Sequence, residues 1–243
     1  MDKKYLLVAE GPTDFVIIKH IARKISAESG NDVTIIEMSP SKDATSGTYP
    51  PHGWGGVKNW CKKYSRHKKA QELSQLAPMA RQMLQRLNWP ALIALNRADG
   101  IIIQLDTDIA HHLNDPLVYP AGTSRRAHCE SSIVLWLNES SVPDEMYLVL
   151  SSHAIETWIL ATHDPAEEIF KDLPSGFNYE QVSDVEARLV TLGYSSYSEK
   201  GTRRLRKSPS STYERHGALV ADKLNEVRSR CSEADAFCAH LDA

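Results

Sequence analysis

The chain lacks the features that mark secreted, membrane-spanning and zinc-binding proteins. Its four cysteines form no C-x-x-C pair, and its ten histidines are not spaced with them as zinc ligands. No apolar run approaches the roughly 18 residues of a membrane span. The apolar stretch near the N-terminus is interrupted by Glu10, which makes it too short for a signal peptide. We therefore expect a cytoplasmic protein with reduced thiols and no membrane partner.

Other absences limit the chemistry. No G-x-x-x-x-G-K-[ST] loop is present, so the chain does not encode its own P-loop ATPase. The net charge is only -3, so no overall basic field indicates nucleic acid. With 243 residues, 42% of them hydrophobic and 24% charged, the composition is that of one globular α/β core with a small extension.

Short apolar runs alternate with segments of helical periodicity. Strands are predicted over residues 4–9, 33–36, 100–105 and 146–150, and helices over 13–26, 127–137 and 152–162, with two or three more between 57 and 98. This order predicts an α/β fold with a mainly parallel sheet of four or slightly more strands, flanked by helices. The run at 100–105 is the most hydrophobic, so we expect it at the centre of the sheet.

Two regions follow from this pattern. Residues 1–163 are expected to form the α/β domain, with an insertion at about 39–98 that begins with a long Ser-, Pro- and Gly-rich loop. No strand is predicted beyond Pro165, so residues 164–243 are expected to be a helical C-terminal extension. Its predicted helices, at 182–192 and 212–231, flank a basic segment that runs from Lys200 to Lys207 without an acid.

Acidic side chains follow two of the predicted strands. Glu10 and Asp14 come after the strand at 4–9, and Asp106 and Asp108 come after the strand at 100–105. Each acid alone has an ordinary explanation as a turn former or a first-turn helix residue. The carboxyl ends of parallel strands converge on one crevice, however, and carboxylates gathered there repel one another without a cation. The joint pattern predicts a site for a divalent metal such as Mg²⁺.

A fifth acid, Glu156, opens the segment Glu156-Thr157-Trp158 after the fourth strand. The pattern strand-Glu10-Gly11-Pro12-Thr13-Asp14-helix, with the later strand-Asp106-Thr107-Asp108, resembles the TOPRIM domain of topoisomerases, bacterial primases and overcoming-lysogenization-defect (OLD) type nucleases. It most resembles the small TOPRIM-like proteins encoded beside ABC-type ATPases in phage-defence operons, where a helix opening with an acid and a Trp also occurs. The specific match covers about 25 residues, and the strand order extends it to residues 1–163.

The resemblance implies a TOPRIM-like Rossmannoid fold and a divalent-metal-dependent endonuclease with two Mg²⁺ or Mn²⁺ ions. It implies an effector of anti-phage defence, with DNA or RNA as substrate and an ABC-type ATPase as partner. Glu10, Asp106 and Asp108 match the first metal site and the catalytic acids, and Asp14 and Glu156 match acids of the second site. Lys207 is the candidate for a late catalytic lysine, with Lys200 as the alternative. The basic residues expected to grip phosphates are Lys200, Arg203, Arg204, Arg206 and Lys207.

Two other interpretations stay open. The first is a non-catalytic TOPRIM-like module that binds nucleic acid or regulates an ATPase. The second is a phosphatase or nucleotide-sugar transferase, because Asp-x-Asp occurs in those classes too. A haloacid-dehalogenase-type phosphatase would place that strand first and need a later Asp-Asp pair, and no such pair occurs. The sequence does not decide between DNA and RNA, or between a monomer and a homo-oligomer.

Overall fold

Four parallel strands form the central sheet. The computed structural model describes residues 2–67, 73–114, 117–120, 122–199, 201–207 and 211–243. The strands are β1 (Lys3–Val8), β2 (Val33–Ser39), β3 (Gly100–Asp106) and β4 (Met146–Ser151), in the order β2-β1-β3-β4. The predicted α/β class, with its mainly parallel sheet, is confirmed. The most apolar strand, β3, lies inside the sheet between β1 and β4, as expected.

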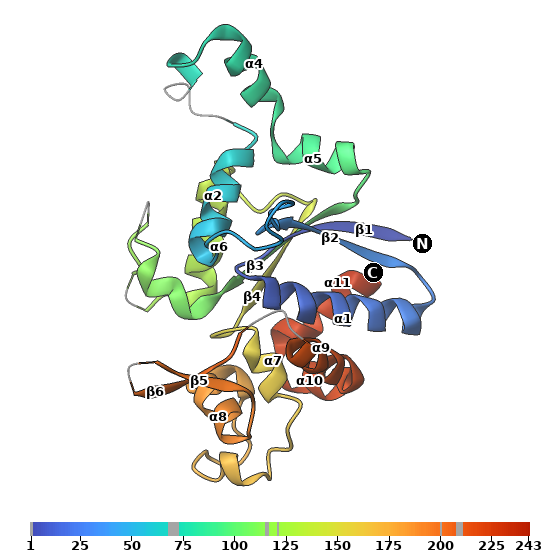
Figure 1. The fold of residues 1–243 in the computed structure, drawn as a ribbon, viewed down its shortest axis with the longest axis vertical. Coiled ribbons are helices and arrows are strands. Elements are labelled where there is room, and N and C mark those ends of the chain that lie inside the picture. Colours follow the sequence, from blue (N-terminus) through green and yellow to red (C-terminus); the bar gives the residue numbers. More distant parts are fainter. Residues whose placement is uncertain (1, 68–72, 115–116, 121, 200, 208–210) are drawn as a thin grey trace.

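Each face of the sheet carries its own hydrophobic core. Successive side chains of a strand point to opposite faces, so Leu7 packs into one core while Leu6 and Val8 pack into the other. Figure 1 shows the long helix α1 on the same side as the C-terminal helices, with α2 and α6 on the other side. These helices are α1 (Pro12–Ser29), α2 (Trp54–Tyr64), α6 (Arg125–Leu137), α9 (Ser211–Asp222), α10 (Leu224–Arg230) and α11 (Ser232–Asp242).

The C-terminal region departs from the predicted helical extension. Strands β5 (Ser196–Glu199) and β6 (Thr202–Leu205) form an antiparallel hairpin, so the prediction of no strand beyond Pro165 was wrong. Most of β5 is exposed, so it lacks the apolar alternation that would have revealed it. Its turn uses Gly201 at φ 82°, a conformation that glycine adopts without steric cost.

Several helices also differ in extent from those predicted. The helix expected over 152–162 is only α7 (Glu156–Leu160), and the one expected over 182–192 is α8 (Val185–Thr191). The helix predicted over 212–231 is divided into α9 and α10, and α11 was not predicted. Three short 3-10 helices complete the described elements: Thr107–His112, Glu168–Phe170 and Tyr179–Gln181.

The insertion contributes α2, α4 (Pro78–Arg86) and α5 (Trp89–Asn96). Pro78 and Pro90 lie in the first turns of α4 and α5, where a missing backbone N–H has no cost. Helix α5 supplies Trp89 to the core that also contains Val57 and Trp60 of α2. Helix α4 has no buried residue and lies apart from the sheet (Figure 1).

The four cysteines are buried and form no disulfide. In the part of the chain that the structure describes, no helix has both the length and the apolar character needed to cross a membrane.

Candidate metal centre

The site lies where the order of the strands reverses. From β1 the chain crosses to β2 on one side and then to β3 on the other, so β1 and β3 are neighbours with a crevice at their carboxyl ends. Ligands of open α/β sheets bind at such switch points. Glu10 follows β1 and Asp106 ends β3, which brings the two predicted acidic clusters to one edge.

Glu10 and Asp106 are in direct contact. The backbone N–H of Asp106 donates to Oε1 of Glu10 at 2.9 Å. The side chain of Gln104 links both residues, because its Oε1 accepts from the backbone N–H of Glu10 at 3.0 Å and its Nε2 donates to Oδ1 of Asp106 at 2.8 Å. The two strand ends are therefore tied together by a buried polar side chain.

The fourth strand also contributes to the position of Asp106. Its Oδ1 accepts from the Ser151 hydroxyl at 3.3 Å and from the backbone N–H of Ile155 at 3.0 Å. Hydrogen bonds among the described residues thus engage Oδ1 of Asp106 and Oε1 of Glu10, and leave the second oxygen of each carboxylate without one. These second oxygens are suited to a cation.

Asp14 and Glu156 approach from two helices and are both buried. Asp14 lies in the first turn of α1, where its Oδ2 accepts from the backbone N–H of Gly11 at 2.7 Å. Glu156 opens α7, and its Oε1 accepts from the Tyr213 hydroxyl at 2.5 Å. Its Oε2 lies 3.0 Å from Nζ of Lys207 but takes no well-aligned hydrogen bond. That buried oxygen is therefore incompletely satisfied, which favours a closer cationic partner.

Burial and mutual repulsion raise the pKa values of four acids of the cluster: Glu10, Asp14, Asp106 and Asp108. Loss of hydration, together with the charges of Asp14 and Asp108, raises the pKa of Glu10 to about 8 against the opposing hydrogen bond from Asp106. Burial, followed by the charge of Glu156, raises the pKa of Asp14 to about 7. Burial is also the first cause of the raised pKa values of Asp106 and Asp108.

Lys207 supplies the positive charge at the centre of this cluster. Burial works against its ammonium group, but the surrounding carboxylates, Glu156 and then Asp106, raise its pKa above the ordinary value. Lys207 follows β6, so the predicted basic segment reaches the acids from the far end of the chain. The ammonium group partly offsets the repulsion between the carboxylates.

The residues fit a divalent cation in their chemistry. Carboxylate oxygens are the ligands that Mg²⁺ and Mn²⁺ prefer, and repulsion between the carboxylates adds to burial in raising the pKa values of Glu10, Asp14 and Asp106. Among the described residues, however, no group of three or more His, Cys, Asp or Glu side chains is gathered as a ready set of ligands. Holding an ion would need the carboxylates to close around it and Lys207 to give way.

The long loop of the insertion forms one wall. The backbone N–H of Gly53 donates to the carbonyl of Glu10 at 2.7 Å. Tyr49 and His52 from this loop line a hollow of about 370 Å³ together with Glu10, Gly11, Pro12, Thr13, Asp14, Gly53, Asp106 and Lys207. A second hollow, of about 300 Å³, shares Lys207 with the first and includes Asp108, His153, Glu156, Arg203 and Arg204. The acid cluster is thus open on two sides.

Comparison with protein-family models, curated proteins and solved structures finds no match. The functional interpretation of this site therefore depends on its own geometry and on the sequence pattern. No family is assigned to the chain.

The described residues of the basic segment lie in different surroundings. Arg203 and Arg204 line the second hollow, where Arg204 also pairs with Glu186 at 3.3 Å. Arg206 is exposed, and its backbone N–H donates to the carbonyl of Ser195. Lys200, the alternative to Lys207, lies outside the described residues. Lys207 lies beside the acids.

Sequence reasoning missed several residues that support the acids. The sequence does indicate a special role for Gln104, because it is a polar residue within the most apolar strand. The indication for Ser151, at the end of β4, is weaker. For Tyr213 there is none, since a tyrosine in a helical segment is ordinarily a core residue and nothing in the sequence connects it to Glu156.

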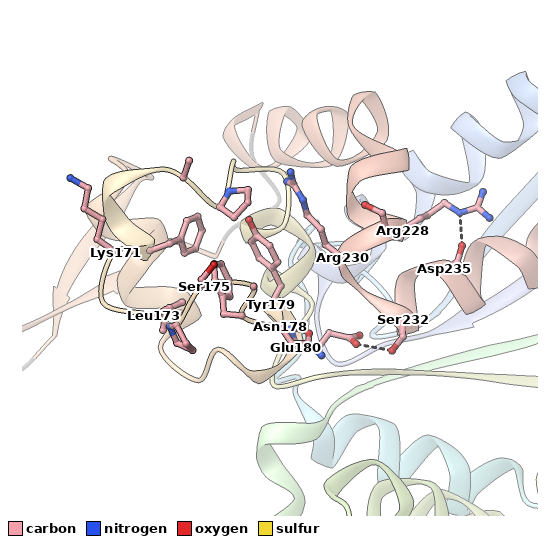
Figure 2. Close-up of a pocket in the computed structure, with 17 residues that line it drawn as sticks. Lys171, Leu173, Ser175, Asn178, Tyr179, Glu180, Arg228, Arg230, Ser232 and Asp235 are labelled. Atoms are coloured by element: carbon pink, nitrogen blue, oxygen red, sulfur yellow. Dashed lines mark hydrogen bonds and ion pairs between the residues drawn. The ribbon is translucent and has the colours of Figure 1, made fainter.

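A larger hollow lies elsewhere, among the turns after α7 and helices α10 and α11, and measures about 990 Å³. Figure 2 shows two interactions at its edge: Arg228 forms an ion pair with Asp235, and the Ser232 hydroxyl donates to Glu180. Arg230 lies over the Tyr179 ring at 5.5 Å and donates to the carbonyls of Ala161 and His163. The polar side chains named here interact with one another or with the backbone, and the described lining contains no cluster of carboxylates like that beside Lys207.

Proposed function

We propose that this protein is a TOPRIM-like endonuclease that hydrolyses nucleic-acid phosphodiesters with two divalent ions. The supporting observation is the contact between Glu10 and Asp106 at the switch point of the sheet, with three further carboxylates around it. Glu10, Asp106 and Asp108 would hold one ion, and Asp14 and Glu156 the second.

Several side chains would have separate roles in the proposed reaction. When bound, Mg²⁺ or Mn²⁺ would stabilise charge on the phosphate oxygens and activate the attacking water. Gln104 and Ser151 keep Asp106 in place, and Tyr213 does the same for Glu156. Lys207 would exchange its interaction with Glu156 for a phosphate oxygen, and so supply positive charge where negative charge develops.

The proposal extends to substrate and partner. Arg203, Arg204 and Arg206, with Lys207, would contact the phosphates of DNA or RNA on either side of the cut, with little dependence on sequence. In keeping with the resemblance, the protein would be a cytoplasmic effector of anti-phage defence that works with an ABC-type ATPase encoded nearby.

A non-catalytic module that binds nucleic acid or regulates an ATPase is the second candidate. One observation favours it: the ammonium group of Lys207 already neutralises part of the acid cluster, and the described carboxylates are not gathered around a common point. A protein of this class would keep the basic surface and the fold but would have no need of an ion.

Substitution of Glu156 by Gln separates the two candidates. The substitution keeps the shape and leaves Oε1 as an acceptor for Tyr213, but removes the charge beside Lys207. If Glu156 holds an ion, cleavage should fall at least about a hundredfold, the size of effect seen when one group that stabilises the transition state is removed. The assay should contain Mg²⁺ or Mn²⁺, DNA and RNA, and the proposed ATPase partner.

The matched control is Glu226→Gln on the exposed surface of α10, which makes the same charge change far from the acids. It should cleave like the wild type. If the wild type cuts neither DNA nor RNA with either metal and the partner present, the nuclease proposal is wrong and the binding module replaces it.

A further inference from the structure

Arg125 forms no ion pair among the described residues, although its charge acts on nearby Asp108. It is the first residue of α6, whose first turn contains no acid. The amino end of a helix already carries partial positive charge, so a cation there is unfavourable unless an anion lies nearby. The adjacent Arg126 is balanced by ion pairs with Glu130 and Glu233. No carboxylate of the described chain lies within ion-pair distance of Arg125.

The interaction that Arg125 does make is chemically mismatched. Its two terminal nitrogens lie 2.9 Å from Nδ1 and 2.9 Å from Nε2 of His153. A guanidinium fork presents only donors, and an imidazole offers at most one lone pair whichever tautomer it adopts. One of the two approaches therefore sets a donor against a donor. The fork is matched instead to two oxygens of a carboxylate or phosphate.

His153 is held in a fixed place beside the acid cluster. It adopts φ 61°, the left-handed region that a non-glycine residue rarely occupies. Its backbone N–H donates to the Thr107 hydroxyl at 3.1 Å, and its carbonyl accepts from the backbone N–H of Asp108 at 3.1 Å. The loop between β4 and α7 is thus fastened to the residues that follow β3. Such strained, well-anchored positions are concentrated at functional sites.

We propose that Arg125 binds a phosphate of the nucleic-acid strand on the Asp108 side of the acid cluster, in place of its mismatched contact with His153. The inference rests on the proposed function, because the ligand is the substrate of that site. Asp108 and His153 line the hollow that also contains Arg203 and Arg204. Arg125 contacts His153 at the edge of this hollow, so a strand leaving the acids through it would come near the guanidinium group.

Equilibrium binding tests this assignment without requiring turnover. Short fluorescent DNA and RNA oligonucleotides are titrated in Ca²⁺, which also binds oxygen ligands, against wild type, Arg125→Gln, Arg125→Lys and Arg126→Gln. Arg125→Gln should weaken binding by about tenfold or more, since charge-assisted hydrogen bonds are removed. Arg125→Lys keeps the charge without the fork and should be intermediate. Arg126→Gln makes the same charge change on the same helix and should have a much smaller effect.

Oligonucleotides with one uncharged methylphosphonate linkage locate the phosphate. At one position the modification should weaken the wild type and have little further effect on Arg125→Gln, because both remove the same interaction. Equal affinities of Arg125→Gln and Arg126→Gln overturn the inference, as does a wild type that binds no oligonucleotide. Weaker binding by Arg125→Gln, together with a wild type that never cleaves, sustains the phosphate site and rejects the nuclease instead.

Discussion

Nζ of Lys207 lies 3.0 Å from Oε2 of Glu156, although the lysine side chain is 42% exposed and the glutamate side chain only 2%. The half-exposed ammonium group of Lys207 thus partly compensates the buried carboxylate of Glu156, which lies 51 positions earlier in the sequence. The pair connects the segment after β6 with the start of α7. If Glu156 holds a divalent ion, as proposed, lysine and metal would compete for this oxygen.

Lys207→Met should destabilise the protein in a chelator at pH 8 by about 1–3 kcal/mol, because a buried carboxylate loses its cation. This is less than for a wholly buried pair, since water reaches the lysine. Mg²⁺ or Mn²⁺ should restore more stability to this variant than to the wild type, and thermal unfolding with and without metal measures the difference. The control is Lys171→Met, which breaks the exposed pair with Glu168 and should change stability little. Equal metal responses in wild type and Lys207→Met would contradict the competition.

The raised pKa values of the acids predict how stability depends on pH without metal. A carboxyl group whose pKa is higher in the folded than in the unfolded protein stabilises the fold below its unfolded pKa, and this contribution is lost as the pH rises through the folded pKa. For Glu10 that window runs from its ordinary value of 4.5 to about 8. In a chelator, the acid cluster should therefore reduce stability progressively between pH 5 and pH 8.

Asp106→Asn isolates this contribution. The amide oxygen can still accept the bonds from Gln104, Ser151 and Ile155, while one charge leaves the cluster. The variant should be more stable than the wild type at pH 8, with a smaller advantage at pH 5, when both are unfolded thermally in a chelator. Subtracting the wild type cancels the titration of histidines elsewhere. A constant difference across this range would show that the pKa of Asp106 is not raised in the folded protein.

The basic segment has a prediction of its own. Replacing Arg203, Arg204 and Arg206 by Gln should weaken nucleic-acid binding similarly for all sequences. It should also reduce the slope of log affinity against log salt by about one for each phosphate that is no longer bound. The replacement of Lys24, Lys171 and Arg228 by Gln makes the same charge change and should leave the slope near that of the wild type. An unaltered slope in the arginine variant would return the segment to an ordinary solvated surface.

The sequence by itself determined the parallel sheet and its acids. Apolar runs of strand length define β1 to β4, and the three- and four-residue spacing of Phe15, Ile18 and Ala22 defines α1, because these patterns are local consequences of burial. The acids at the ends of β1 and β3 were placed at one edge on the same basis, since parallel strands share a direction.

Only the tertiary structure decided which distant residues join them. The strand order brings β1 beside β3, and packing of α9 on α1 carries Tyr213 to Glu156 across 57 positions. The hairpin β5–β6, which Lys207 follows, has too little apolar periodicity to be predicted from its local sequence. The mismatched interaction of Arg125 with His153 also depends on distances between segments that the sequence keeps apart. Such interactions are set by the packing of whole elements, which no local pattern records.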